Sequence, residues 1–536
     1  MKASFPAAFL ATALLFTPAF CPSATAAEAA TAEQAAPAVE AATTWLDTLT
    51  NAVNWIDDKV WGVTFSVFGY PVPLLIILIL FGGIYLTIRL GGMQFRHLPR
   101  ALRYMVRNEK GGKGEVSSFG ALCTALSATI GTGNIVGVAT AVVAGGPGAL
   151  FWMWLAALFG MATKYSEGLL AVKYRSHDPK TGHVLGGPFY YIERGMGMKW
   201  SWLAKIFAFF GMCVGLFGIG TFTQVNSITG AVTNFFDPNQ RLAVQILGNS
   251  YSWVTVIGSL LLALMVGLVV IGGLKRIAKV SERVIPFMVV LYVAFALLLI
   301  CYNIKAVPHA FVRIFEGAFG QATAGRAAFG GAIGAMVAAM QKGIARGIFS
   351  NEAGLGYAPI AAAAAQTREP VRQGLVSMTG TFLDTIVVCS MTGLALVIAG
   401  FGTLSGTESE GAEATMEAFK AGLPFLPPWV VGFVLMICMV LLGFTTILGW
   451  DYYSERCLEY LSHGNMKRVL VFRWIYIVAV FIGPYMTISA VWGIADIFNG
   501  LMAIPNMIAL LALSGVITRE TRSYFERLRR GEVADD

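Results

Sequence analysis

Long uncharged apolar runs dominate this chain, and shorter stretches rich in lysine and arginine separate them. A helix needs about 20 apolar residues to cross the hydrocarbon core of a bilayer. Eleven runs approach or exceed that length, so the pattern predicts an all-α polytopic membrane protein with about 11 spans. The predicted spans cover residues 71–90, 117–145, 148–172, 202–231, 251–273, 284–304, 330–364, 372–401, 428–453, 470–488 and 490–516.

Composition favours a membrane protein over a soluble one. Of the 536 residues, 56% are hydrophobic and 13% are charged, whereas an average soluble domain has about 25% charged residues. The 60 glycines fit as well, because glycine allows close helix contacts and broken helices inside a bilayer. The five histidines have no spacing that predicts a metal site, and the cysteines in apolar runs favour packing over disulfides.

The N-terminus has the pattern of a secretory signal. A positive charge at Lys2 precedes an apolar stretch over 5–20 and a small-x-small cleavage site at 24–26. We therefore expect a signal peptide over 1–26. An extracytoplasmic, Ala/Glu-rich leader and an amphipathic segment would follow over 27–69.

Positive charges are distributed unequally between alternate connections of the predicted spans. If the first span runs inward, 28 lysines and arginines fall on one side and 6 on the other. Connections rich in these residues stay in the cytoplasm, so the bias predicts an extracytoplasmic N-terminus and a cytoplasmic tail over 517–536. The expected location is the plasma membrane, here a bacterial inner membrane. A basic face against anionic lipid explains the net charge of +8 without nucleic acid.

Small and polar residues interrupt the predicted span 117–145 near its middle. The string Ser127-Ala128-Thr129-Ile130-Gly131-Thr132-Gly133-Asn134 is poor helix material in an apolar segment. Unwound backbone at membrane depth persists only where it lines a cavity or a bound ion. The string therefore predicts a substrate and ion site, with helix-end amides facing a carboxylate and free carbonyls facing a cation. Gly133 and Gly137 alone would fit a helix-packing face equally well, but the full string favours the site.

A second interruption, over 341–356, brings glycines and charges into the alanine-rich span 330–364. Each interrupted span would lead a unit of five spans, 117–304 and 330–516, as in an inverted five-plus-five repeat. The span 71–90 would be one additional N-terminal helix of a transporter domain over 70–516. Topology and glycine placement carry this prediction, because the two units have no convincing residue-level similarity.

Two other classes of protein fit this pattern poorly. A membrane enzyme would need a nucleophile or metal cluster near the bilayer surface, and the sequence offers no such constellation. An ion channel would not need two broken helices leading two units of five spans. The pattern therefore favours a transporter.

Four strings, in this order, closely resemble the alanine or glycine:cation symporter family. They are Gly131-Thr132-Gly133-Asn134, Gly186-Gly187-Pro188-Phe189-Tyr190-Tyr191-Ile192-Glu193, Ala345-Arg346-Gly347-Ile348-Phe349-Ser350-Asn351-Glu352-Ala353-Gly354 and Thr445-Thr446-Ile447-Leu448-Gly449-Trp450. The resemblance covers roughly residues 70–520 and implies a LeuT-type fold with sodium-coupled uptake of alanine or glycine. The signal peptide and the leader are departures from the usual pattern.

The resemblance also implies a substrate site. Gly220 and Gln224 are one helical turn apart, as are Thr446 and Trp450, so each pair shares a helix face. The bare glycine would leave room for a small ligand, the amide and hydroxyl would bind it, and the indole would cover it. The substrate-binding residues expected are Thr129, Gly131, Thr132, Gly133, Gly220, Gln224, Gly343, Thr446 and Trp450.

A sodium site is expected beside the substrate, built from Ser127, Ile130, Thr445 and Thr446. Hydroxyl and carbonyl oxygens are hard ligands that suit an alkali cation. The alternative for each threonine is a hydrogen bond back to its own helix. No carboxylate is expected beside Thr129 or Thr446, which favours sodium over a proton relay.

The remaining polar residues of the spans are expected to gate the site or support the structure. Asp384 would cost about 3 kcal/mol if it were unpaired in mid-bilayer, so it either supports a cation or pairs with another polar group, the structural role being favoured. Arg346 and Glu352 are expected to pair across the second break. The gating or structural group comprises Asn134, Arg346, Glu352 and Asp384, whereas Lys164, Glu167, Asp451 and Glu455 are expected near the cytoplasmic interface.

These observations predict a monomeric secondary transporter that moves alanine or glycine inward with sodium by alternating access. It would need no cofactor and no partner besides the amino acid, Na⁺ and the bilayer. The alternative is a proton-coupled or broader-specificity amino-acid permease of the same fold.

Overall fold

The computed structural model describes residues 45–533, apart from 68, 108, 110–111, 113, 178–182, 240, 242, 247–248, 321–330 and 403–410. These residues belong to one compact unit that begins at Trp45. The expected signal peptide, 1–26, and the leader up to residue 44 lie outside the described residues. The expected amphipathic segment is the helix α2, Trp45–Trp61.

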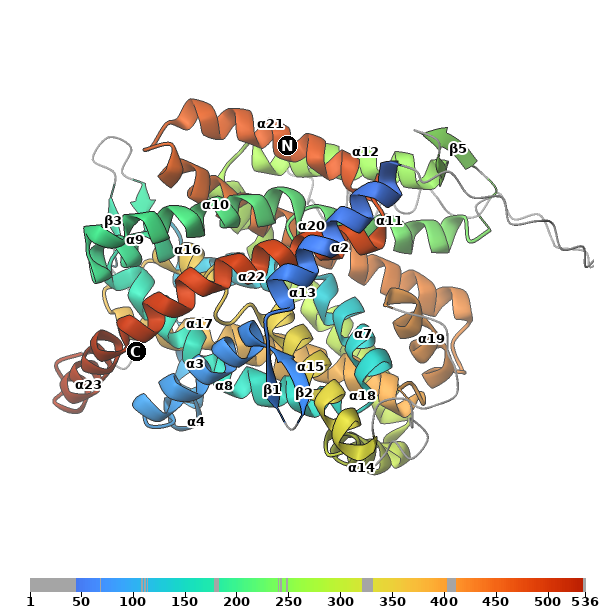
Figure 1. Ribbon diagram of the computed structural model, residues 1–536, viewed down its shortest axis with the longest axis horizontal. Coiled ribbons are helices and arrows are strands. Elements are labelled where there is room, and N and C mark those ends of the chain that lie inside the picture. Colours follow the sequence, from blue (N-terminus) through green and yellow to red (C-terminus); the bar gives the residue numbers. More distant parts are fainter. Residues whose placement is uncertain are drawn as a thin grey trace, which may run out of the picture. The chain divides into compact units, whose positions relative to one another are not determined.

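Helices make up most of the described structure (Figure 1). The first half has α3 (Leu74–Arg89), α4 (Met93–Arg96), α5 (Leu98–Val106), α6 (Ser118–Thr129), α7 (Val136–Gly145), α8 (Ala149–Lys173), α9 (Pro188–Tyr191), α10 (Ser201–Phe217), α11 (Phe222–Phe236), α12 (Trp253–Val270) and α13 (Leu274–Tyr302). The second half has α14 (Val307–Ala318), α15 (Gly331–Asn351), α16 (Ala358–Ala363), α17 (Pro370–Thr381), α18 (Ser390–Ile398), α19 (Ala412–Gly422), α20 (Pro428–Leu461), α21 (Met466–Ile482), α22 (Ile488–Ala512) and α23 (Ser514–Arg529).

Short elements connect these helices. Three antiparallel hairpins pair β1 (Thr64–Val67) with β2 (Tyr70–Pro73), β3 (Ser176–His177) with β4 (Val184–Leu185), and β5 (Ala243–Ile246) with β6 (Asn249–Ser252). The 3₁₀ turns are η1 (Thr132–Asn134), η3 (Met198–Trp200), η4 (Ile304–Ala306) and η8 (Gly483–Tyr485), and the π-helical segments are η2 (Ile192–Met196) and η7 (Phe382–Cys389).

Several helices meet the length and apolarity needed to cross a bilayer. Six do so among the described residues, and the bent pair α6 and α7 makes a seventh if it is one span. α3 is apolar but shorter, at 16 residues. The structure therefore confirms a polytopic helical protein, whereas the number of eleven spans and the inverted repeat stay predictions.

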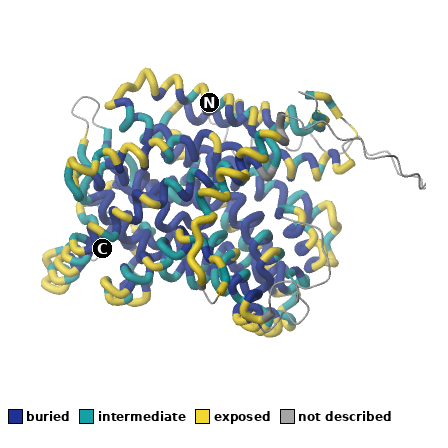
Figure 2. The backbone as a smooth tube through the Cα atoms, viewed as in Figure 1, coloured by how far each residue is buried: buried dark blue, intermediate teal, exposed yellow. Residues whose placement is uncertain are grey.

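The outer helices contain many exposed residues (Figure 2), and many of these are large and apolar. Leu260, Leu264 and Leu268 of α12 and Trp474 and Val478 of α21 are all exposed. An exposed apolar surface of this extent is costly in water and is what a hydrocarbon environment requires.

The first predicted break is present. α6 and α7 meet at an angle of 61°, and extended backbone at Ile130 and Gly131 separates them. Gly131 and Gly133 favour a break at this point, because glycine is about 1 kcal/mol less favourable than alanine within a helix.

The second break is later and shorter than its sequence suggests. α15 continues through Gly343 and Gly347 to Asn351, and the chain unwinds only over 352–357. A Cβ on Gly343 would lie 2.2 Å from the carbonyl oxygen of Ala149. The glycines within α15 therefore serve close packing against α8 rather than unwinding, a common use of glycine between membrane helices.

Two further irregularities have no counterpart in the sequence prediction. A turn over 218–221 separates α10 from α11 within the predicted span 202–231. The segment η7 is π-helical and joins α17 to α18 within the predicted span 372–401. Such π-helical insertions recur at functional sites, and this one contains Asp384.

α8 is the main packing partner of the helices around the second break. α15, α16 and α17 all pack against it, and α6 packs against α13, α16 and α20. Arg175, just beyond the end of α8, donates hydrogen bonds to the carbonyl oxygens of Ala363 at 2.8 Å, Ala365 at 2.6 Å and Thr367 at 2.6 Å. This guanidinium therefore fastens the end of α16 to the end of α8.

Arg175→Lys tests that attachment. A lysine ammonium keeps the charge but cannot reproduce the planar fork that reaches three carbonyls. We expect the free energy of unfolding to fall by about 1–3 kcal/mol, seen as a lower midpoint of thermal unfolding in detergent. Arg468→Lys, at an exposed position, is the control and should leave the midpoint unchanged. An equal midpoint in both variants would contradict the assigned role of Arg175.

Candidate functional site

At the first break, side chains supply hydrogen-bond partners for the unwound backbone. The side-chain oxygen of Asn134 accepts a hydrogen bond from the amide of Gly131 at 2.9 Å. The side-chain nitrogen of Asn134 donates to Asp384 Oδ1 at 2.6 Å. Asn134 thus supports the unwound backbone on one side and a buried carboxylate on the other, both fully enclosed by protein.

Gln224 and Thr446 reach the same break from α11 and α20. Gln224 Oε1 accepts hydrogen bonds from the backbone amide of Thr132 at 3.3 Å and from its hydroxyl at 3.1 Å. A Cβ built on Gly131 would lie 2.5 Å from Thr446 Oγ1, so only glycine allows this approach. The structure thus brings together four of the predicted substrate-binding residues: Gly131, Thr132, Gln224 and Thr446.

Trp450 lies one turn after Thr446 and is completely buried. Its ring meets that of Tyr357, beside the second break, with centroids 3.9 Å apart and an edge-on geometry. Its indole nitrogen has no hydrogen-bond partner in the described part of the chain. A buried donor of this kind is rare in folded proteins and leaves a hydrogen bond for a ligand to make.

Three of the four predicted sodium ligands lie close together. Thr446 Oγ1 is 3.5 Å from the carbonyl oxygen of Ile130, and a Cβ on Gly449 would lie 2.7 Å from Ser127 Oγ. All three predicted hydroxyl ligands also donate within their own helices: Ser127 to Thr124 at 2.8 Å, Thr446 to Leu442 at 3.0 Å, and Thr445 to Leu441 and Leu442 at 3.0 Å. The Thr445 hydroxyl lies on another side, 4.0 Å from Met288 Sδ on α13.

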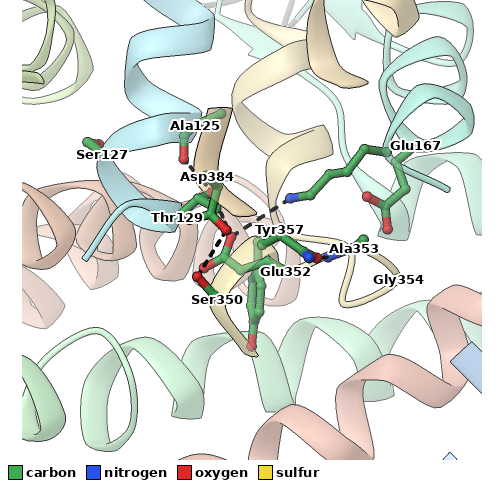
Figure 3. A network of polar contacts seen from close by, with 12 residues as sticks. Ala125, Ser127, Thr129, Glu167, Ser350, Glu352, Ala353, Gly354, Tyr357 and Asp384 are labelled. Carbon is green, nitrogen blue, oxygen red and sulfur yellow. Dashed lines mark hydrogen bonds and ion pairs between the residues drawn. The ribbon is translucent and has the colours of Figure 1, made fainter. Parts of the chain in front are cut away.

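The second break places a carboxylate beside the first. Glu352 follows α15 directly and has a positive φ of 56°, and Gly354 and Gly356 after it have φ of 90° and 89°. Thr129 Oγ1, at the end of α6, donates to Glu352 Oε2 at 3.3 Å. Figure 3 shows Thr129, Ser350, Glu352 and Asp384 gathered at this point. The expectation that no carboxylate lies beside Thr129 was therefore wrong.

Lys164 is the cation that accompanies Glu352. Its ammonium lies 4.0 Å from Glu352 Oε2, and both side chains are almost fully buried. Glu167, one turn later on α8, is also buried and accepts a hydrogen bond from Asn506 at 2.7 Å. The side chains of Lys164 and Glu167 both lie in the protein interior at the second break, and their expected position near the cytoplasmic interface stays a prediction. α8 packs against both α15 and α16, so its charged side chains lie beside the second break.

Asp384 is held by hydrogen bonds rather than by a direct ion pair. Besides Asn134, the hydroxyls of Ser350 at 2.9 Å and Thr385 at 2.7 Å donate to it. No lysine or arginine of the described ranges forms an ion pair with it. Asp384 therefore joins η7 to both broken helices.

Arg346 does not form the expected pair with Glu352. Its guanidinium lies over the rings of Trp492 at 5.0 Å and Phe349 at 5.6 Å. It also faces Asp57 of α2, whose pKa is raised to about 7 by burial and by the neighbouring Asp496 and Asp58, Arg346 acting in the opposite direction. Arg346 lies within α15 and contacts Trp492 of α22, whereas Glu352 lies just beyond the end of α15. The two charged groups therefore do not meet.

Gly220 and Gly343 make close backbone contacts in this conformation, and their roles in substrate binding stay predictions. Gly220 lies in the turn before α11, where a Cβ would be 2.4 Å from the carbonyl oxygen of Gly215 and 2.7 Å from Trp450 Cβ. Gly343 packs against α8, about two turns before the end of α15. Each glycine permits a close backbone contact and does not provide space for a ligand. Gly133, by contrast, faces the ring of Phe349 next to the break, at 3.5 Å from its Cβ position.

Replacing Gly220 with alanine should therefore affect folding before substrate choice. The added methyl group has no space, so we expect a loss of about 1–3 kcal/mol in the free energy of unfolding, measured by thermal unfolding in detergent. Gly230→Ala, within the helix α11 that follows Gly220, has nothing within 4 Å of the new methyl group and should be neutral or stabilising. A stable Gly220→Ala variant with altered amino-acid preference would instead support a direct role of Gly220 in substrate binding.

Sequence reasoning missed Lys164, Glu167, Ser350 and Asn506 as members of this region. Lys164 and Glu167 carried a signal, because an ionisable residue within a predicted span marks a functional site unless it snorkels to the interface. Asn506 donates to Glu167 and, at 2.8 Å, to the carbonyl oxygen of Gly354. Nothing in the local sequence of α22 distinguishes this asparagine from one that faces a neighbouring helix.

A bundle of apolar helices, of which two are unwound around buried polar groups, defines a membrane transporter. The sequence model of the sodium:alanine symporter family matches residues 46–535, and this chain belongs to that family. It is a transporter and not an enzyme.

Known relatives cover nearly the whole chain. A Haemophilus influenzae protein named only as an uncharacterized transporter is 52% identical over 490 residues, which are 91% of this chain and 99% of the relative. The sodium/alanine symporter AgcS of Methanococcus maripaludis is 44% identical over 489 residues, 90% of this chain and 98% of AgcS. Among solved structures, one of MhsT in complex with L-phenylalanine covers 77% of this chain and 99% of that chain. Its sequence identity is 12% and its TM-score is 0.44.

Proposed function

We propose that this protein carries alanine or glycine into the cell together with sodium, by alternating access. The supporting observation is the first break. There Gly131, Thr132, Gln224 and Thr446 put unwound backbone, a side-chain amide and a hydroxyl around one point inside an apolar bundle. These groups suit the carboxylate and ammonium of an amino acid, and the buried Trp450 limits the space beside them.

The substrate site is closed in this conformation. The predicted substrate residues touch one another, with Thr446 Oγ1 only 2.5 Å from the Cβ position of Gly131. An amino acid would enter only after the broken helices move apart, which is the behaviour of a transporter that opens to one side at a time. Small substrates fit best, because little space would have to be opened.

The same proposal includes the finer architecture. Eleven spans of a LeuT-type five-plus-five repeat are supported by the order of the helices and by the placement of the breaks at α6–α7 and α15–α16. The predicted orientation has an extracytoplasmic N-terminus and a cytoplasmic tail in a bacterial inner membrane. The charge bias of the connections supports it.

Sodium is the proposed coupling ion, bound near Ile130, Ser127 and Thr446, where carbonyl and hydroxyl oxygens converge. The contact of Thr129 with Glu352 favours the alternative, a proton-coupled permease of the same fold, more than the sequence alone did. A buried carboxylate that is hydrogen-bonded to a substrate residue could carry a proton.

Uptake of labelled alanine into proteoliposomes separates these ions. We expect accumulation with an inward sodium gradient at equal pH, and little uptake with an inward proton gradient in potassium buffer. The control is liposomes without protein under the same gradients. Uptake that follows the proton gradient and ignores sodium would contradict the proposal and select the alternative.

Neutralising one or both charges of the Glu352–Lys164 ion pair provides a second test. Glu352→Gln leaves the Lys164 ammonium buried without its anion, so we expect a loss of about 3–5 kcal/mol in stability and reduced uptake. Lys164→Met combined with Glu352→Gln removes both charges and should recover part of both properties. Glu316→Gln, on the exposed surface of α14, is the control and should change neither property.

The double variant also bears on the role of the charged pair in transport. If it unfolds at the wild-type temperature yet has lost sodium-driven uptake, at least one of Glu352 and Lys164 acts in transport beyond stabilising the fold. Sodium-driven uptake in a stable double variant supports a structural role for the pair.

A further inference from the structure

A basic cleft lies between the end of α3 and the helix α23. It has a volume of about 640 Å³, and Arg89, Arg519 and Arg522 line it together with Thr518 and Glu526. The Nη2 atom of Arg89 lies 4.0 Å from the Cβ position of Gly515, at the start of α23. The side chains around this cleft thus carry more positive than negative charge.

The three arginines are available to a ligand. All three are exposed, and none forms an ion pair with the described residues. Two neighbouring charges on α23 are paired, Arg527 with Glu369 at 2.7 Å and Glu520 with Lys173 at 2.8 Å. Arg519 and Arg522, which border the cleft, have no such partner among the described residues.

The orientation of α23 is fixed by its opposite face. Ile517, Thr521 and Tyr524 are buried, and the hydroxyls of Thr521 and Tyr524 lie 2.7 Å from Tyr165 OH and 3.1 Å from Tyr104 OH. These contacts hold Arg519 and Arg522 toward the cleft without a ligand. The cleft is consequently a property of the folded chain rather than of mobile side chains.

An apolar stripe on α3 leads to the same cleft. Leu74, Phe81 and Ile88 are spaced by seven residues, so they share one helix face, and they are 49%, 57% and 73% exposed. The stripe runs for most of the helix, which spans about 24 Å, close to one hydrocarbon core. It ends beside Arg89, whose guanidinium lies over the ring of Tyr85 at 5.7 Å.

We propose that this cleft binds the headgroup of an anionic phospholipid, whose acyl chain lies along the Leu74–Phe81–Ile88 stripe. Guanidinium groups pair with phosphate oxygens through two parallel hydrogen bonds, and basic pockets at the cytoplasmic ends of membrane helices favour anionic lipids. Thr518 supplies a hydroxyl at the same place. Under the proposed orientation the lipid belongs to the cytoplasmic leaflet. The inference does not depend on which solute or ion the protein transports.

A free phosphate ion would use the same arginines but not the stripe. The apolar face of α3 next to Arg89 has no purpose for a small anion, whereas it matches a ligand with a charged head and a long apolar tail. The continuity of the arginines with this face therefore favours lipid.

Lipid retention by the purified full-length protein tests the proposal. The protein is washed in detergent, offered either phosphatidylglycerol or phosphatidylcholine, and analysed for bound lipid by native mass spectrometry. We expect one phosphatidylglycerol per protein to be retained and phosphatidylcholine to be lost. Arg519→Gln with Arg522→Gln should weaken phosphatidylglycerol binding about 30-fold.

Arg529→Gln with Arg530→Gln is the matched control. It removes the same charge from the end of the same helix but outside the cleft, and binding should stay within about twofold of the wild type. Equal losses in the two double variants, or equal retention of both lipids, would overturn the proposal. If the first double variant does not fold, Arg89→Gln tests the same cleft from α3.

Competition with inorganic phosphate separates a lipid site from a site for a free anion. At equal ionic strength, phosphate and chloride should displace phosphatidylglycerol to the same extent. Selective displacement by phosphate would indicate a site for a free anion and would overturn the assignment to lipid.

Discussion

The need to satisfy unwound backbone inside an apolar bundle controls the centre of this structure. A peptide group in hydrocarbon cannot form hydrogen bonds with water, so each break in a helix requires polar side chains from elsewhere in the chain. Asn134 and Gln224 supply them at the first break, and Asn506 supplies them at the second. These amides come from α11, α22 and the first break itself. The unwound segments therefore determine which helices must meet.

The charges follow the same constraint. Lys164, Glu167, Glu352 and Asp384 all lie in the interior, and carboxylates outnumber the ammonium in this group. Glu352 has a nearby cation, and Glu167 and Asp384 are held by amides and hydroxyls instead. A region with this balance attracts positive charge, which is consistent with a protein that binds a cation as part of its work.

The sequence predicted the class of fold and the position of the first break, because apolar runs and an uncommon Gly-Thr-Gly-Asn string leave few alternatives. It also placed Gln224 and Thr446 on the faces that meet Gly131, since the spacing along a helix determines its faces. It could not place Lys164 beside Glu352 or send Arg346 to Trp492, because both depend on how distant helices pack. The close backbone contact of Gly220 was not foreseeable for a related reason: a glycine that provides space and one that permits contact look the same in sequence.

The three hydrogen bonds of Arg175 limit how the second broken helix can move. Since they tie the backbone beyond α16 to the end of α8, α16 cannot swing freely at its far end. At its near end, Gly354 and Gly356 have positive φ, and a turn over 352–357 separates α16 from α15. Any rotation of α16 relative to α15 would therefore fall on this turn, because the opposite end of α16 is held to α8 by three carbonyl contacts.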